Sequence, residues 1–320
     1  MVINIPTSND FYLSGEELFN FAWDALLRLV KNLDESSYYG IDQEEVSEQY
    51  WEGAKRTVST SLTIIQQGVE FFLKGRIASI SPYLLIADPP AKWPSINSED
   101  GQNIQPIDFS KFRTLDAQDL VKVYNTFSPQ PLGGEFVERF NKMRERRNAI
   151  IHSVTSTDDL NVKQVIESLL FVHNDFFPTV KWAERRKYFL LFSPDAELAE
   201  PDWALTATCL EVSLVAKMLQ PSETLSLLGI NKKLREYFCP KCLAESDQDI
   251  TFEIKLAHLK SKSPDETNLY CPICNLNHKV LRKECDEKYN SLIESSACPG
   301  NVISEEYGQC LTCGQYHEVR

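Results

Sequence analysis

Apolar residues recur at helical spacing along most of the chain before position 237. A capping-box pattern at residues 14–17 precedes an apolar stripe over residues 18–29, and together they predict the first helix. A second, longer stripe predicts a helix over residues 43–80. Prolines and polar residues fill positions 88–108, where a helix cannot continue and we expect a long loop.

Helical patterning then resumes, with only short turn-rich interruptions. It predicts further helices over residues 116–127, 135–152, 158–177 and 202–219. After position 237 the apolar segments become short, partly alternating and separated by turn residues, as in a small β-rich module. We therefore expect a mainly α protein, with an all-α bundle of five or more helices at residues 1–236 and a β-rich module at residues 237–320.

The balance of charge narrows the function classes. The 320 residues carry a net charge of −13, from 33 basic and 46 acidic residues, which argues against a protein that coats nucleic acid by bulk electrostatics. No apolar run reaches the roughly 18 residues that a membrane helix needs, and the N-terminus lacks a basic segment followed by an apolar one. We expect a cytoplasmic protein with no membrane contact.

Cysteines are concentrated near the C-terminal end of the sequence. Of the 9 cysteines, Cys209 stands alone and the others all follow position 238. Two CPxC knuckles supply Cys239, Cys242, Cys271 and Cys274, and each knuckle presents two thiolates that fit two corners of a zinc tetrahedron. Because the cytosol keeps thiols reduced, these four residues predict a zinc ribbon rather than disulfides.

A second zinc site is predicted from an internal repeat. The pattern CxxC-x3-H-x-V occurs at residues 271–280 and again at residues 310–319. Cys310 and Cys313 would then need two more ligands, for which we choose Cys285 and Cys298. The main alternative replaces Cys285 by His317. Each of the two predicted sites would then have a shell of four sulfurs with no open position, which is typical of a structural zinc ion. We therefore expect two structural zinc ions.

The sequence does not assign a single role to the cysteine module. Residues 237–320 contain 9 basic and 13 acidic residues, so the module is a poor candidate for non-specific nucleic-acid binding. Protein interaction, target selection and sensing all stay open.

The candidate catalytic residues are Arg147, Asn148 and His152, which follow the densest basic cluster of the chain. On a helix, Asn148 and His152 share one face, and Arg147 lies about 100° from Asn148. Arginine can clamp phosphate oxygens bidentately, histidine can move protons near neutral pH, and asparagine can orient either the imidazole or the phosphate. Arg146 is the alternative phosphate ligand.

This segment resembles the RNxxxH signature of the HEPN domain, an all-α fold found in many prokaryotic RNA-cleaving toxins and defence proteins. Residues 66–74 resemble the second helix of that family, and residues 112–120 fall in the expected order. The similarity extends over roughly residues 11–180. It implies a homodimer in which two motifs meet in one cleft.

The resemblance also implies an activity. Family members cleave RNA by attack of the 2′-hydroxyl, which needs no metal ion and leaves a 2′,3′-cyclic phosphate and a 5′-hydroxyl. We therefore expect a toxin or antiviral defence effector, with RNA as substrate and a neutralising or sensor protein as a further partner. The alternative is a catalytically silent HEPN scaffold whose zinc module binds a protein. Glu70 and Lys74 we interpret as an intrahelical ion pair rather than as catalytic groups.

Overall fold

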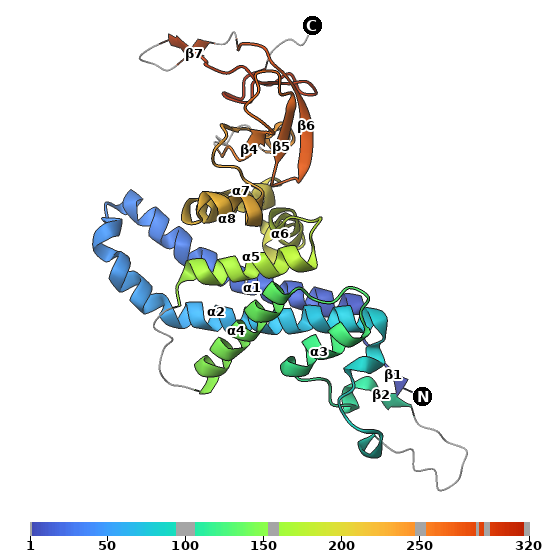
Figure 1. Ribbon diagram of the computed structural model, residues 1–320. Coiled ribbons are helices and arrows are strands. Elements are labelled where there is room, and N and C mark those ends of the chain that lie inside the picture. Colours follow the sequence, from blue (N-terminus) through green and yellow to red (C-terminus); the bar gives the residue numbers. More distant parts are fainter. Residues whose placement is uncertain are drawn as a thin grey trace. The chain divides into compact units, whose positions relative to one another are not determined.

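The computed structural model describes residues 2–93, 106–152, 160–246, 254–285, 288–290 and 295–316 (Figure 1). They form two compact units, Met1–Val172 and His173–Arg320. The predicted fold class is confirmed, because the chain is mainly helical and all its described strands except β1 and β2 lie in a small β-rich region near the C-terminal end. Among the described helices, none offers a stretch long and apolar enough to cross a membrane.

The first unit is built around α2, the longest helix, which packs against α1, α3 and α4. Its elements are β1 (Val2–Ile3), α1 (Ser8–Glu35), α2 (Gln43–Ile80), β2 (Ile107–Asp108), α3 (Ala117–Phe127), α4 (Gly134–His152) and most of α5 (Val162–Phe176). The strands β1 and β2 form a short parallel pair. Because α2 touches three other helices, a side chain on it can meet residues from distant parts of the sequence.

Helices α1 and α2 approach each other closely at two glycines. A Cβ atom on Gly15 would lie 2.5 Å from the Phe72 ring, and one on Gly68 would lie 2.7 Å from the Phe19 ring. The rings of Phe19 and Phe72 meet edge to face, with centroids 4.9 Å apart. Only glycine at both positions lets the two backbones come near enough for these rings to interlock.

The first helix begins earlier than its sequence pattern predicts. Thr7 is the N-cap of α1, and its side chain forms a reciprocal capping box with Asp10. Ser14 lies inside the helix, where its hydroxyl donates to the Asp10 carbonyl oxygen at 3.0 Å. Two capping patterns stand close together in the sequence, and the helix uses the first.

The described part of the second unit combines four α-helices with a small sheet that carries the cysteine knuckles. Its elements are α6 (Trp182–Leu191), α7 (Trp203–Met218), α8 (Pro221–Leu228), β3 (Glu236–Tyr237), α9 (Pro240–Glu245), β4 (Ala257–Leu259), β5 (Asn268–Cys271), β6 (Leu276–Leu281), β7 (Lys288–Asn290), β8 (Ser295–Ala297) and β9 (Ile303–Ser304). Five strands form one antiparallel sheet in the order β3-β4-β5-β6-β9, and β7 pairs with β8.

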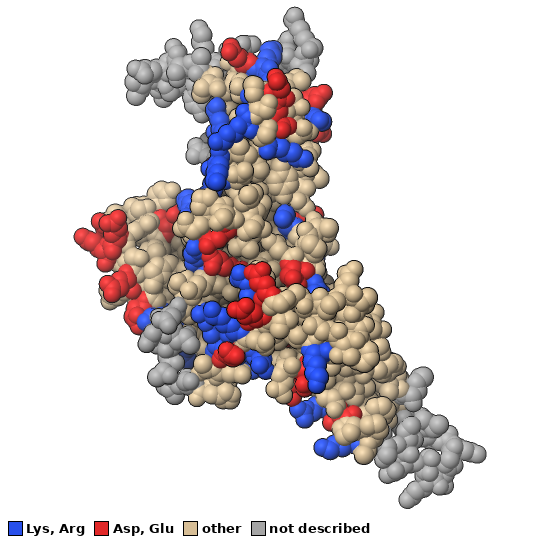
Figure 2. Space-filling model, in the orientation of Figure 1, with Lys and Arg blue, Asp and Glu red and all other residues tan. Residues whose placement is uncertain are grey.

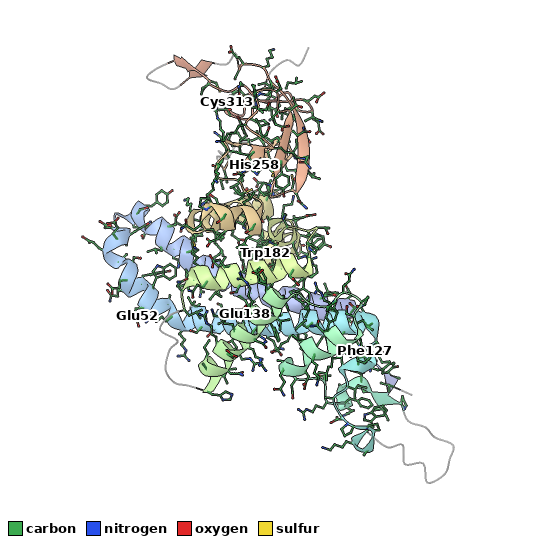
Figure 3. The ribbon with its side chains drawn as sticks, viewed as in Figure 1. Glu52, Phe127, Glu138, Trp182, His258 and Cys313 are labelled. Carbon is green, nitrogen blue, oxygen red and sulfur yellow. The ribbon has the colours of Figure 1, made fainter. Side chains whose placement is uncertain are left out.

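The boundary between the units differs from the one expected at residues 236 and 237. Helices α6 to α8 belong to the same unit as the sheet, and the division falls inside α5. His258 of β4, labelled in Figure 3, shows one reason, since its Nε2 lies 3.1 Å from the Gly229 carbonyl oxygen after α8. Asn275 likewise donates to the Thr179 carbonyl oxygen at 3.1 Å. The expected boundary followed the change in composition at the first cysteine of the module. In the structure, the segments on either side of that position pack together in one unit.

His173 is a buried, neutral histidine in this unit. It is 1% exposed, and its ring centroid lies 5.3 Å from those of Phe177 and Trp182. Its Nδ1 lies 3.4 Å from the Asn174 side-chain oxygen, and no described group hydrogen-bonds to its Nε2. Burial lowers the pKa of His173 from 6.5 to about 4, so the ring carries no charge at neutral pH.

Acid is expected to destabilise the second unit through this residue. The unfolded chain takes up a proton at His173 below its ordinary pKa of 6.5, whereas the folded chain does so only below about 4. The free energy of unfolding is therefore not reduced by this residue above pH 6.5, and it falls by about 3 kcal/mol by pH 4. Denaturant unfolding of His173→Phe from pH 7 to 4 should show a shallower loss of stability than the wild type.

Any metal ion held by the cysteine thiolates of this unit would be released in acid, which would also destabilise the unit. The two proteins are therefore compared at each pH, and His152→Phe, at an exposed position, should match the wild-type slope. Equal slopes for the wild type and His173→Phe would contradict the burial of a neutral imidazole.

Candidate functional site

The motif that contains Arg147, Asn148 and His152 lies on α4, which packs against α2 in the first unit. The Nη2 atom of Arg147 lies 3.1 Å from Oε1 of Glu70, although 77 residues separate the two in sequence. The Nη1 atom of the same guanidinium donates to the side-chain oxygen of Asn148 at 3.2 Å. The Glu70 side chain is 9% exposed and that of Arg147 is 25% exposed, so the guanidinium is held at a partly open surface.

These groups line a polar cavity of about 420 Å³. Its lining residues are Glu70, Lys74, Thr114, Leu115, Asp116, Ala117, Gln118, Arg144, Arg147 and Asn148. Asp116 already accepts a hydrogen bond from Arg113 outside this set. The Nε atom of Arg144 is buried and has no hydrogen-bond partner among the described residues. Beside the two carboxylates, the cavity therefore offers three cationic side chains and two amides to an anionic ligand.

The prediction that Glu70 pairs with Lys74 is wrong. Its carboxylate pairs with Arg147, while the Lys74 ammonium lies 5.8 Å from the centroid of the Phe71 ring. Helical spacing predicts only local neighbours. Glu70 is thus a site residue that sequence reasoning missed, and its place within the family-like segment 66–74 was the signal available.

The structure does not bring His152 into this cavity. His152 is the last residue of α4, is exposed, and is followed by residues 153–159, which are outside the described residues. The helix places it one turn beyond Asn148.

Arg146 lies on a different side of α4 from Arg147. It lines a separate cavity of about 420 Å³ that also includes Glu135, Glu138 and Arg139. Asn148 lines the same cavity as Arg147 and not that of Arg146. Of the two arginines considered from sequence, Arg147 is the one that shares a cavity with another motif residue.

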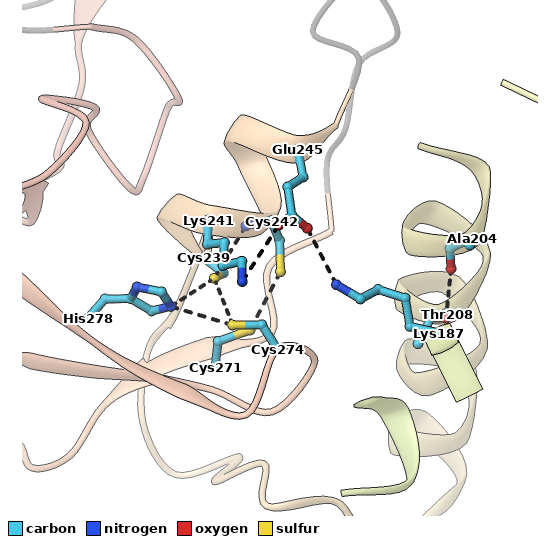
Figure 4. Close-up of polar contacts among 10 residues, drawn as sticks. All are labelled: Lys187, Ala204, Thr208, Cys239, Lys241, Cys242, Glu245, Cys271, Cys274 and His278. Atoms are coloured by element: carbon cyan, nitrogen blue, oxygen red, sulfur yellow. Dashed lines mark hydrogen bonds and ion pairs between the residues drawn. The ribbon is translucent and has the colours of Figure 1, made fainter. Parts of the chain in front are cut away.

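The first cysteine cluster, drawn in Figure 4, gathers the two CPxC knuckles in the second unit. Cys239 Sγ lies 3.6 Å from Cys274 Sγ, and Cys242 Sγ lies 3.9 Å from Cys271 Sγ. A disulfide would need about 2.05 Å, whereas a tetrahedral zinc ion with bonds of about 2.3 Å sets its sulfurs about 3.8 Å apart. The four residues therefore fit a zinc ion.

The chemistry of the cluster agrees with its geometry. All four thiols are buried, and burial raises the pKa of Cys271 well above its ordinary value. A buried thiolate needs a nearby cation, which a zinc ion would provide. His278 faces the cluster from β6, with Nε2 at 3.4 Å from Cys239 Sγ and 3.5 Å from Cys274 Sγ. It lies where a ring N–H can donate to a ligand sulfur without replacing it.

The second cluster contains the four cysteines chosen from sequence. Cys285 Sγ lies 3.7 Å from Cys313 Sγ, and Cys298 Sγ lies 4.0 Å from Cys310 Sγ. All four sulfurs lie within 4.8 Å of one another, which again fits a zinc ion. His317, the alternative ligand, is outside the described residues. The cysteine-rich region thus holds two separate groups that could each bind one zinc ion.

No family model matches this chain, and no curated protein or solved structure proved similar to it. Function must therefore be inferred from the chain's own residues.

Proposed function

We propose that this protein is a HEPN-type endoribonuclease that cleaves RNA without a catalytic metal ion. One observation carries the proposal: Arg147 and Asn148 of the motif meet Glu70 and Lys74 of α2 in a polar cavity. A guanidinium fixed by a largely buried carboxylate is preorganised to bind the oxygens of a phosphate. Glu70 is then a positioning residue, since it acts through Arg147.

The reaction is an internal transfer at phosphorus. The 2′-oxygen of a ribose forms a bond to the adjacent phosphorus as its proton passes to a base, and the bond from phosphorus to the 5′-oxygen breaks as that oxygen receives a proton. The products are a 2′,3′-cyclic phosphate and a 5′-hydroxyl. Arg147 stabilises the charge of the crowded phosphorane, and Asn148 orients the phosphate or the imidazole.

His152 is the group suited to the two proton transfers. One imidazole cannot be base and acid at once, and it does not line the cavity of its own chain. A homodimer that joins two motifs in one cleft would supply two imidazoles and two guanidinium groups. We therefore propose that the active form is a dimer, as the family resemblance implies.

The two cysteine clusters bind structural zinc ions in this proposal, because each has a closed shell of four sulfurs. Reduced cysteines are in keeping with the cytoplasm. A role as a toxin or antiviral effector, controlled by a neutralising or sensor protein, follows from the resemblance alone.

The second candidate is a catalytically silent scaffold whose zinc region binds a protein partner. Two observations favour it. The Arg147 guanidinium already pairs with Glu70, and His152 lies outside the cavity that Arg147 lines. This candidate requires no cleavage of any RNA.

Cleavage in EDTA separates the two candidates. The purified protein is expected to cut single-stranded RNA at an undiminished rate in EDTA, because the proposed chemistry uses side chains alone. The fragments should carry cyclic phosphate ends, detected by mass spectrometry, and light scattering at the assay concentration should give a dimer. Zinc content is measured after the EDTA step, so that loss of the cysteine region is not mistaken for loss of a catalytic metal. Intact RNA with a full zinc complement would favour the scaffold.

A further inference from the structure

A second cationic cavity lies within the second unit, at one end of its sheet. It has a volume of about 270 Å³, and none of its described lining residues is acidic. The lining includes three cations, Arg235, Lys262 and Arg282, and two hydroxyl groups, Ser261 and Ser263. Figure 2 shows Lys and Arg side chains in a run along the left edge of the β-rich part of this unit. The cavity is therefore locally cationic, although residues 237–320 together carry more acidic than basic residues.

Sheet topology brings the three cations together. Strand β3 runs antiparallel to β4, with Tyr237 opposite Ala257, and β5 runs antiparallel to β6, with Asn268 opposite Lys279. The start of β3, the end of β4 and the end of β6 consequently lie at the same end of the sheet. Each of these ends contributes one of the three cations that line the cavity, so the fold gathers them from separate parts of the sequence.

The guanidinium of Arg282 has unused hydrogen-bonding capacity. Its Nε and Nη1 atoms are buried, and neither has a hydrogen-bond partner among the described residues. Leaving buried donors unpaired costs free energy. A phosphate oxygen that reached either donor would accept from it and reduce that cost.

The loop that carries the two serines is held in place before any ligand binds. The Ser261 hydroxyl donates to Oε2 of Glu266 at 3.1 Å, and the backbone N–H of Asn268 donates to Oε1 of Glu266 at 2.9 Å. The backbone N–H of Ser263 donates to the Ser261 hydroxyl at 3.3 Å. Because Glu266 and Ser261 make these bonds, Lys262 stands on a turn whose backbone is already ordered, and little backbone entropy is lost on binding.

We propose that this cavity binds a phosphate group of an RNA strand and thereby recruits substrate to the protein. Three cations and the Ser263 hydroxyl around one small cavity match a tetrahedral anion better than a carboxylate, which has only two oxygens. The choice of RNA as the source of the phosphate rests on the proposed function. The site differs from the cavity at Arg147, which lies in the other unit.

Binding is tested with a strand that cannot be cleaved. A fluorescent single-stranded RNA with 2′-O-methyl riboses lacks the attacking hydroxyl, so its anisotropy on the full-length protein reports binding alone. The triple variant Arg235→Gln/Lys262→Gln/Arg282→Gln is expected to bind this strand at least about tenfold more weakly. It should lower the salt slope by about 0.7, as expected when one phosphate contact on a single strand is lost. Lys217→Gln/Lys260→Gln/Lys279→Gln makes the same change in net charge outside the cavity and should lower the affinity much less.

The following outcomes would contradict or limit the proposal. Equal affinities of the wild type and the first triple variant, with zinc content and thermal stability retained, would overturn the proposal. Equal losses of affinity in the two triple variants would also overturn it, because they would show that RNA responds to the net charge of the protein and not to this cavity. A parallel titration uses inorganic phosphate and a nucleoside monophosphate, and a cavity that bound only these would be a free-anion site and not an RNA site. Loss of strand binding in a protein that never cleaves RNA would uphold the cavity while removing the proposed catalysis.

Discussion

Alanine in place of His152 is expected to slow RNA cleavage by about 10²-fold to 10⁴-fold, the range that a positioned general acid or base contributes. His152 is exposed at the end of α4, so its removal should leave the fold intact. Single-turnover rates with excess protein measure the effect, and circular dichroism checks the helices. An unchanged rate would remove His152 from the mechanism.

Companion variants assign the remaining roles. Arg147→Ala should lower the rate by about 10²-fold to 10³-fold, as expected when one charge-stabilising donor is lost. Glu70→Gln should have a smaller effect of about tenfold, or roughly 1.4 kcal/mol, because the guanidinium remains but loses its anchor. Arg146→Ala is the matched control, since Arg146 lines another cavity. A large loss in Arg146→Ala with none in Arg147→Ala would transfer the phosphate-binding role.

Serine in place of Cys271 is expected to unfold the β-rich part of the second unit. Structural zinc contributes on the order of 10 kcal/mol to folding, and the small sheet cannot replace it. Cys271 also pairs with Leu276 in the β5 and β6 register, so loss of the ion should open these strands. Residues 1–172 have their own core around α2 and should stay folded. Hydrogen exchange read by mass spectrometry distinguishes the two units.

Metal analysis gives the count. The wild type is expected to contain two zinc ions per chain, and Cys209→Ala, at a buried cysteine outside both clusters, should retain both. About one ion in the wild type would uphold the first cluster and remove the second. A full complement in Cys285→Ser would show that Cys285 is not a ligand and would turn attention to His317.

Sequence reasoning succeeded where the local pattern was continuous. The apolar stripe over residues 43–80 matches α2, which begins after the Asp42 cap. Helix α6 was not predicted, because its polar centre leaves little amphipathic pattern to detect. Helix α8 is short, and a stretch of that length carries too few apolar positions to establish a period.

The cysteine ligands and the motif cavity differ in how far they could be predicted. Each CPxC knuckle encodes its own geometry within four residues, so the first cluster could be assigned from spacing. Cys285 and Cys298 are brought to the second knuckle by the fold alone. Glu70 was assigned to a local partner because a long-range partner such as Arg147 leaves no mark on a single sequence.

The two cysteine clusters are consecutive along the chain and do not interleave. Every residue of the first cluster, ending at Cys274, precedes Cys285, the first residue of the second. During synthesis the first four cysteines can therefore capture an ion before the second four have been made. If both clusters bind zinc as proposed, each ion would meet its own complete set of ligands first, which would disfavour mixed four-cysteine combinations. In a cell short of zinc, the chain would accumulate as a defined half-loaded species rather than as a set of misassembled ones.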